Sequence, residues 1–106
     1  MRDLKWSAVE KKMARRAFDA AFQKECTAVI QRLTALAVDA RRPDDIWTIH
    51  DYLTEQRKTI DEKYDYRYSQ LIIILGRLLS EKWIEEDDIA GLSDEKLQII
   101  HHIASL

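Results

Sequence analysis

The stretch FDAAFQKECTAVIQRLTAL, residues 18–36, decides the fold of this chain. Its apolar side chains recur at steps of three and four residues, which places them along one face of an α-helix; they are Phe18, Phe22, Cys26, Val29, Leu33 and Leu36. Upstream, Ser7-Ala8-Val9-Glu10 matches the capping box that begins a helix, in which the serine and glutamate side chains bind free backbone N–H groups. No proline or glycine follows before Pro43. The sequence therefore predicts one helix from Ser7 to Ala40.

The length of this helix predicts an elongated molecule. At about 1.5 Å per residue, Ser7 to Ala40 spans roughly 50 Å, whereas a compact domain of this size has a radius of gyration of about 13 Å. Part of the helix must therefore extend beyond its own domain. Since an uncovered apolar stripe would be exposed to water, we expect it to pair with a second copy of the chain.

The rest of the chain predicts three further helical segments. Pro43 and the two acids after it favour the first turn of a helix, with an expected buried stripe of Ile46, Ile49, Leu53, Ile60 and Tyr64. Residues 64–69 fit either a bend or a continuing helix. The nearly continuous apolar run of residues 71–75 and 78–79 predicts a buried helix, and we reject a strand because the chain offers it no partner strands. Residues 85–92 form an acidic connector, and Ser93 is expected to cap a last helix that runs to Leu106.

Composition supports a single all-α domain over residues 1–106. The chain has two glycines, one proline and no asparagine, with 46% hydrophobic and 34% charged residues. A sandwich or a doubly wound fold needs more turn-forming residues than this. The net charge of −2 is not that of a nucleic-acid-binding protein. Basic residues do gather near the start of the long helix, but they surround it rather than follow one face, which leaves nucleic-acid binding a distant alternative.

Cysteine usage and hydropathy predict a location in the cytoplasm. Cys26 is the single cysteine, so no disulfide can form within the chain, as expected in a reducing compartment. The N-terminal residues 1–6 lack the apolar run of a signal peptide, and no stretch has the length of apolar sequence that a membrane span needs. We therefore expect no integral membrane segment.

One face of the second helix is a candidate contact surface. The helical period brings together the side chains of Trp47, His50, Asp51, Thr54, Arg57, Lys58 and Asp61, beside the expected apolar stripe. Tryptophan and arginine dominate the hot spots of protein interfaces. A solvated face with ion pairs four residues apart is the alternative interpretation.

The same residues do not predict an enzyme. His50-Asp51 occurs as a ligand pair in metal phosphohydrolases, but such sites need several more His and Asp ligands, and the chain has three histidines. Two glycines cannot build a nucleophile elbow or a phosphate-binding loop. We expect no catalytic residues, no metal and no cofactor.

The second helix and the residues after it resemble the fluorescence recovery protein family of cyanobacteria. Residues 44–53 read DDIWTIHDYL, where the family has D-D-L-W-x-L-H-D-F-L. The family pattern then continues R-x-x-I-D-G-K-Y-D-x-R, which this chain matches at Arg57, Ile60, Asp61, Lys63, Tyr64, Asp65 and Arg67. The resemblance covers essentially the whole chain and is strongest from Asp44 to Ser69.

This resemblance implies an antiparallel homodimer, with stalk helices over about residues 7–66 and a C-terminal head over about residues 67–106. It also implies a non-enzymatic regulator that binds the photoactivated orange carotenoid protein, through that protein's C-terminal domain, and accelerates its return to the inactive orange form. Non-photochemical quenching at the phycobilisome then ends. The corresponding location is the cytoplasm, including the cytoplasmic face of thylakoid membranes. The alternative function is a helical dimeric adaptor of the same family type that serves another protein partner.

The resemblance also assigns site residues. Trp47, His50, Asp51 and Arg57 match a patch that serves dimerisation and activity. The expected partner-binding residues of the head are Ile73, Leu75, Ile99, His102 and Leu106. The chain departs from the family pattern at three places: Glu62 replaces glycine, residues 72–75 lack phenylalanine, and residues 98–102 lack lysine.

Overall fold

A computed structural model describes residues 4–106, which contain five helices and no strand. The helices are α1 (Ala8–Asp39), α2 (Pro43–Lys63), α3 (Tyr68–Ser80), α4 (Glu86–Ile89) and α5 (Asp94–Ala104). The described residues do not include Met1, Arg2 and Asp3. These three belong to the N-terminal segment, residues 1–6, in which we expected no signal peptide. None of the helices within residues 4–106 is long and apolar enough to cross a membrane.

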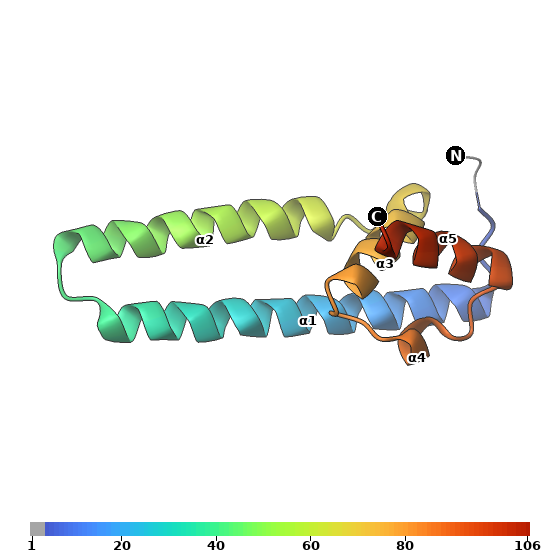
Figure 1. Ribbon diagram of the computed structural model, residues 1–106, viewed down its shortest axis with the longest axis horizontal. Helices are drawn as coiled ribbons and strands as arrows, with labels where there is room; N and C mark the ends of the chain where they lie inside the picture. Colours follow the sequence, from blue (N-terminus) through green and yellow to red (C-terminus); the bar gives the residue numbers. More distant parts are fainter. Residues whose placement is uncertain (1–3) are drawn as a thin grey trace.

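Helices α1 and α2 form a long antiparallel hairpin, and α3, α4 and α5 gather at the end where α1 begins (Figure 1). The molecule measures 53 × 24 × 24 Å and its radius of gyration is 16.7 Å, against about 13 Å for a compact domain of this length. The predicted elongation is therefore confirmed, as is the long first helix.

Local sequence signals explain where the two long helices begin. Ser7 Oγ accepts a hydrogen bond from the Glu10 N–H (3.1 Å), and the Glu10 carboxylate accepts one from the Ser7 N–H (3.0 Å). This is the predicted capping box. At the tip of the hairpin, the Asp45 carboxylate accepts hydrogen bonds from the N–H groups of Arg41 and Arg42. Those two hydrogen bonds hold the pKa of Asp45 below its usual value.

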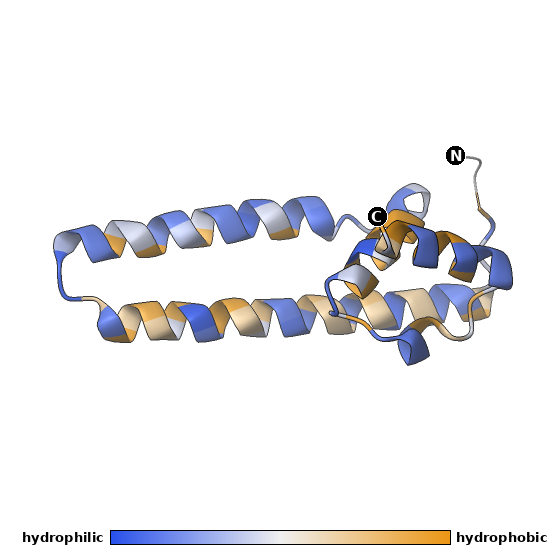
Figure 2. Ribbon diagram, viewed as in Figure 1, coloured by the Kyte–Doolittle hydropathy of each residue, from blue (hydrophilic) through white to orange (hydrophobic). Residues whose placement is uncertain are grey.

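The hydrophobic core lies where α3 and α4 pack against the first half of α1 and α5 packs on α3. Small residues of α1 allow this close packing, and Figure 2 shows the apolar character of α3. The buried apolar residues are Ala14, Ala17, Phe18, Ala21, Leu71, Ile72, Ile74, Leu75, Leu78, Ile84, Ile89, Leu92 and Ile100. The predicted buried helix over residues 71–79 is thus a helix rather than a strand.

Glu10 also fastens the start of α1 to α5. Its carboxylate accepts a hydrogen bond from the Ser93 N–H (2.9 Å) and forms an ion pair with Lys96 Nζ (3.2 Å). Lys96 Nζ donates as well to the Lys5 carbonyl (2.6 Å). Burial raises the pKa of Glu10, but the hydrogen bonds from Ser7 and Ser93 and the charge of Lys96 outweigh it, so the pKa lies below its usual value.

Three expectations need correction. The apolar stripe of α2 is not buried within the chain: Ile46 is 58% exposed, its other members are half-buried, and the buried residue of α2 is Lys63. The reason is that α1 alone runs alongside this part of α2 (Figure 1), and one helix cannot cover the whole stripe.

The acidic connector contains the short helix α4, and the last helix ends at Ala104 rather than Leu106. Residues 64–67 form the bend that the sequence left open.

Helices α3 and α5 approach most closely at Gly76. A Cβ atom at this position would lie 2.5 Å from Ile103 Cγ2 and 2.7 Å from Ile103 Cβ. The Ile103 Cβ is fixed to its backbone, so the contact can be relieved only by moving α5. Gly91 offers a matched comparison, because a Cβ there would meet the flexible end of Met13 at 2.6 Å.

We expect Gly76→Ala to lower the free energy of unfolding by about 1–2 kcal/mol. Overpacking costs about 1–3 kcal/mol, and the better helix propensity of alanine returns up to about 1 kcal/mol. Gly91→Ala should stay within about 0.5 kcal/mol of the wild type, since the methionine can rotate away. Urea unfolding of both variants measures this difference, and equal losses would contradict it.

Candidate functional site

The stalk, which we define as residues 26–39 of α1 and 43–62 of α2, contains no buried side chain within the described chain. It nevertheless carries large apolar side chains that face water, with exposed fractions of about 60%: Ile30, Val38, Ile46 and Trp47. Isolated apolar residues on a surface are common, but side chains that are at most half-buried give this part of the hairpin less hydrophobic stabilisation than a closed core would. Apolar surface of the stalk is therefore left uncovered within the single chain.

The patch predicted from the resemblance lies on α2 and is exposed. The rings of Trp47 and His50 meet edge to face with centroids 6.3 Å apart, and His50 Nδ1 lies 3.4 Å from Asp51 Oδ1. The side chain of Arg57 is 85% exposed and its Nε lies 3.5 Å from Asp61 Oδ2. Since this ion pair is exposed and four residues apart, it adds little to stability. The roles of these residues stay predictions.

Two grooves run along the stalk, and Arg57 lines both. One groove, of about 430 Å³, is lined by His50, Leu53, Thr54, Arg57, Lys58 and Asp61. Most of the residues that the helical period predicted on one face of α2 therefore line the same groove. The other, of about 400 Å³, lies between α1 and α2. Its walls are mainly apolar and include Cys26, Val29, Ile30, Leu53 and Ile60. Cys26, which the sequence placed on the apolar face of the first helix, is half-buried and forms part of the wall of this groove.

The predicted head residues divide into surface and core. Ile73 is 42% exposed and Leu106 is 88% exposed, His102 is exposed, and Ile99 is half-buried. Leu75 is fully buried in the core. This corrects the expectation for Leu75: two residues beyond Ile73 on a helix, it faces the opposite side and packs inside the head.

Two of the basic residues near the start of α1 contact aromatic rings. The Arg15 guanidinium lies 4.3 Å from the ring centroid of Tyr66 and pairs with Asp19 at 3.1 Å. Lys11 Nζ lies 5.2 Å from the ring centroid of Tyr68. These two cations therefore have neighbours within the chain, which weakens the case for a phosphate-binding stripe.

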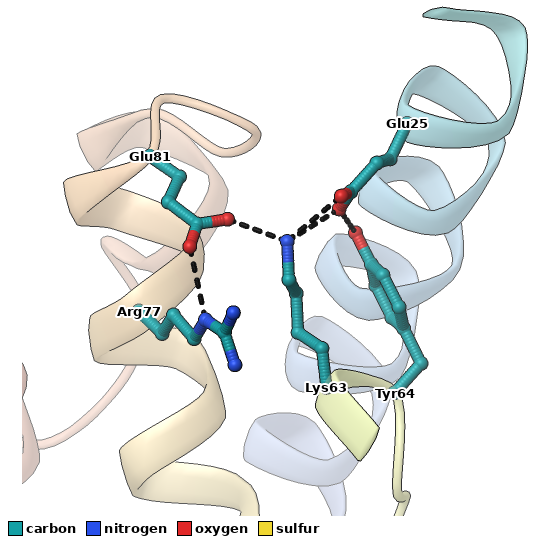
Figure 3. A network of polar contacts seen from close by, with 5 residues as sticks. All are labelled: Glu25, Lys63, Tyr64, Arg77 and Glu81. Carbon is teal, nitrogen blue, oxygen red and sulfur yellow. Dashed lines mark hydrogen bonds and ion pairs between the residues drawn. The ribbon is translucent and has the colours of Figure 1, made fainter. Parts of the chain in front are cut away.

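A network that we did not predict joins the stalk to the head (Figure 3). Lys63 Nζ donates to both carboxylate oxygens of Glu25 at 2.8 Å and to Glu81 Oε1 at 2.5 Å. The Tyr64 hydroxyl donates to Glu25 (2.8 Å), and Arg77 Nε donates to Glu81 (2.9 Å). Glu25 belongs to α1, Lys63 to the end of α2, and Arg77 to the last turn of α3. The network thus connects three helices at one point.

Charge is balanced within this network, which makes its burial possible. Two cations face two carboxylates, and the side chains of Lys63 and Glu25 are 3% and 8% exposed. Burial raises the pKa of Glu81, but hydrogen bonds and charge from Lys63 and Arg77 outweigh it and hold the pKa below its usual value. Burial and the hydrogen bond to Glu25 raise the pKa of Tyr64, so its hydroxyl stays protonated and remains a donor.

One sequence signal pointed toward this network. Glu25 lies four residues beyond Ala21 and three beyond Phe22, so it continues the row of α1 that faces the core. A carboxylate on a buried face needs a cation or several donors. The sequence does not say which of the 17 lysines and arginines provides the cation.

The fold and these surfaces define a class of protein, an elongated all-helical molecule with an uncovered stalk and a packed head. No group of three or more His, Cys, Asp or Glu side chains that could hold a metal ion occurs within residues 4–106. The family model for the photoprotection regulator fluorescence recovery protein matches residues 6–104. The chain belongs to the fluorescence recovery protein family, whose members regulate photoprotection.

Individual relatives agree with this assignment. The chain is 33% identical over 101 residues to the fluorescence recovery protein of Synechocystis sp. PCC 6803, covering 95% of this chain and 93% of that protein. Solved structures of the fluorescence recovery proteins of Fremyella diplosiphon and Synechocystis sp. PCC 6803 match with a TM-score of 0.92, at 35% and 32% identity. Each match covers 96% of this chain and 100% of the other.

We expect Lys63→Met to lower the free energy of unfolding by about 3–5 kcal/mol, because it leaves the buried Glu25 carboxylate without its cation. Lys24→Met removes an exposed lysine next to Glu25 in sequence and should change stability by less than about 0.5 kcal/mol. Urea unfolding at one protein concentration compares the two variants. Equal stability of both would mean that the network contributes nothing.

Proposed function

We propose that this chain acts as a homodimer that binds the photoactivated orange carotenoid protein and accelerates its return to the orange form. Non-photochemical quenching at the phycobilisome would end as a result. The observation that carries this proposal is membership of the fluorescence recovery protein family over residues 6–104. The exposed patch on α2 and the exposed residues of the head supply surfaces on which binding can take place. The proposed location is the cytoplasm, including the cytoplasmic face of thylakoid membranes.

The uncovered stalk supports the homodimer. Residues 26–39 and 43–62 contain no buried side chain, yet the groove between α1 and α2 has mainly apolar walls. A second hairpin packed antiparallel on the first would complete a four-helix arrangement and give these side chains a core. The proposed division is two stalk helices over about residues 7–66, of which residues 26–39 and 43–62 form the stalk defined above, and a head over about residues 67–106.

The proposed action needs differential binding and no cofactor. A protein accelerates a conformational return when it binds the transition state between two arrangements more tightly than it binds the open one. Two surfaces on one chain suit a partner made of two domains. Arg57 and its neighbours Trp47, His50 and Asp51 form the first surface. The second consists of Ile73, Ile99, His102 and Leu106, which we assign to the partner's C-terminal domain.

The dimer predicts the behaviour of two stalk variants. Sedimentation or light scattering should give wild-type protein roughly twice the 12.5 kDa chain mass at micromolar concentration. Leu33→Glu should give the monomer, because a carboxylate buried without a partner costs several kcal/mol. Gln31→Glu introduces the same charge at an exposed position and should remain a dimer. Monomeric wild-type protein would refute the proposal.

Recovery in darkness tests the regulatory function. Adding the wild-type protein to photoconverted orange carotenoid protein should accelerate the red-to-orange change, whereas Arg57→Leu should accelerate it less. Arg57→Lys should also be weaker, because an ammonium group cannot form the two parallel hydrogen bonds of a guanidinium group. Melting temperature and helicity should stay near wild type, since the Arg57–Asp61 pair is exposed.

Each outcome of that experiment has a distinct meaning. An unchanged recovery rate at excess wild-type protein would favour the adaptor function for another partner. Full activity of Arg57→Leu, or its failure to fold, would remove Arg57 from the proposed binding surface.

A further inference from the structure

A small pocket lies where α2 ends and α3 begins, beside the exposed side chain of Ile73. Its volume is about 190 Å³, and its lining includes Glu62, Asp65, Arg67, Gln70, Ile73 and Arg77. Pockets for small-molecule ligands measure about 300–1,000 Å³. This pocket is too small for such a ligand and has the size for one side chain of a partner protein.

The charges of the pocket are paired, with one exception. Asp65 pairs with Arg67 at 2.5 Å, Arg77 pairs with Glu81 at 2.9 Å, and the Lys63 ammonium is turned toward Glu25 and Glu81. Within residues 4–106, Glu62 forms no ion pair and no side-chain hydrogen bond. The three cations of the lining, Lys63, Arg67 and Arg77, each have a carboxylate partner, so Glu62 is the one charged side chain of this lining without an ion pair among the described residues.

The position of Glu62 is unfavourable for its own helix. It lies in the last turn of α2, which ends at Lys63, and it directly follows Asp61. The C-terminal end of a helix carries partial negative charge, so a carboxylate there is repelled rather than stabilised. The negative charge of Glu62 is therefore stabilised neither by its helix nor by an ion pair within the described chain.

We propose that Glu62 and Ile73 form a subsite for one lysine or arginine side chain of the partner, an inference that rests on the proposed function. The aliphatic part of such a side chain packs on Ile73 while its charged group pairs with Glu62. A carboxylate from the partner is disfavoured, because Glu62 repels it.

Binding of photoconverted orange carotenoid protein tests the subsite. Glu62→Gln keeps the shape and removes the charge, and it should weaken binding about two- to fivefold, the range for an exposed ion pair. It should also reduce the dependence of affinity on salt concentration. Glu62→Lys places a cation against a cation and should weaken binding tenfold or more.

Glu55→Gln is the matched control. Glu55 is an exposed carboxylate of the same helix, two turns earlier and on the same face, and it does not line the pocket. The control makes the same change in net charge and should bind as the wild type does. A stability measurement completes the test: Glu62→Gln should be as stable as wild type or slightly more so, because it removes a carboxylate from the helix C-terminus.

The outcomes separate this inference from the proposed function. Wild-type binding together with unchanged binding of Glu62→Gln would overturn the subsite and leave the function intact. Equal weakening by Glu62→Gln and Glu55→Gln would also overturn it, since general charge would then be the cause. Failure of the wild-type protein to bind would overturn both.

Discussion

The ammonium group of Lys63, buried between the carboxylates of Glu25 and Glu81, determines how the rest of the molecule is arranged. Residues 64–67 are not helical, so the chain itself sets no fixed angle between α2 and α3. The ion pairs supply that constraint, because they bind the end of α2 to α1 and to the end of α3 at once. Arg77 completes the arrangement by neutralising the second carboxylate. Buried ions give a defined geometry only when all their partners are present.

On either side of this junction, the two halves of the molecule are stabilised in different ways. The head has a packed core, formed where α3 and α4 pack against the first half of α1 and α5 packs on α3. The stalk has none within the chain, and its apolar side chains line an open groove. In the proposed dimer, the head keeps its shape while the stalk provides the surface for association. It also explains why a chain of 106 residues folds with such an elongated outline.

Local signals in the sequence predicted the helices well. The capping box at Ser7, the proline at the start of α2 and the serine at the start of α5 each mark an observed helix boundary. What the sequence could not supply is the identity of the element that covers each face. Helical periodicity placed Ile46 in a buried stripe, and the family resemblance assigned Leu75 to a partner-binding surface, whereas Ile46 is exposed and Leu75 is buried. The Lys63 network escaped prediction for the same reason, since its members lie up to 56 residues apart between Glu25 and Glu81.

Glu10 belongs both to the capping box that begins α1 and to the contacts that hold the start of α5. This double role has a consequence for how the protein opens locally. The same carboxylate that caps α1 also accepts the Ser93 N–H and pairs with Lys96 at the start of α5. Fraying of the first turn of α1 therefore removes a support of α5, and loosening of α5 removes a support of that turn. The starts of α1 and α5 therefore belong to one cooperative unit in the sense of native-state hydrogen exchange, and their amides should become exposed to solvent together. The starts of α1 and α5, more than 80 residues apart in sequence, are held together through the side chain of Glu10.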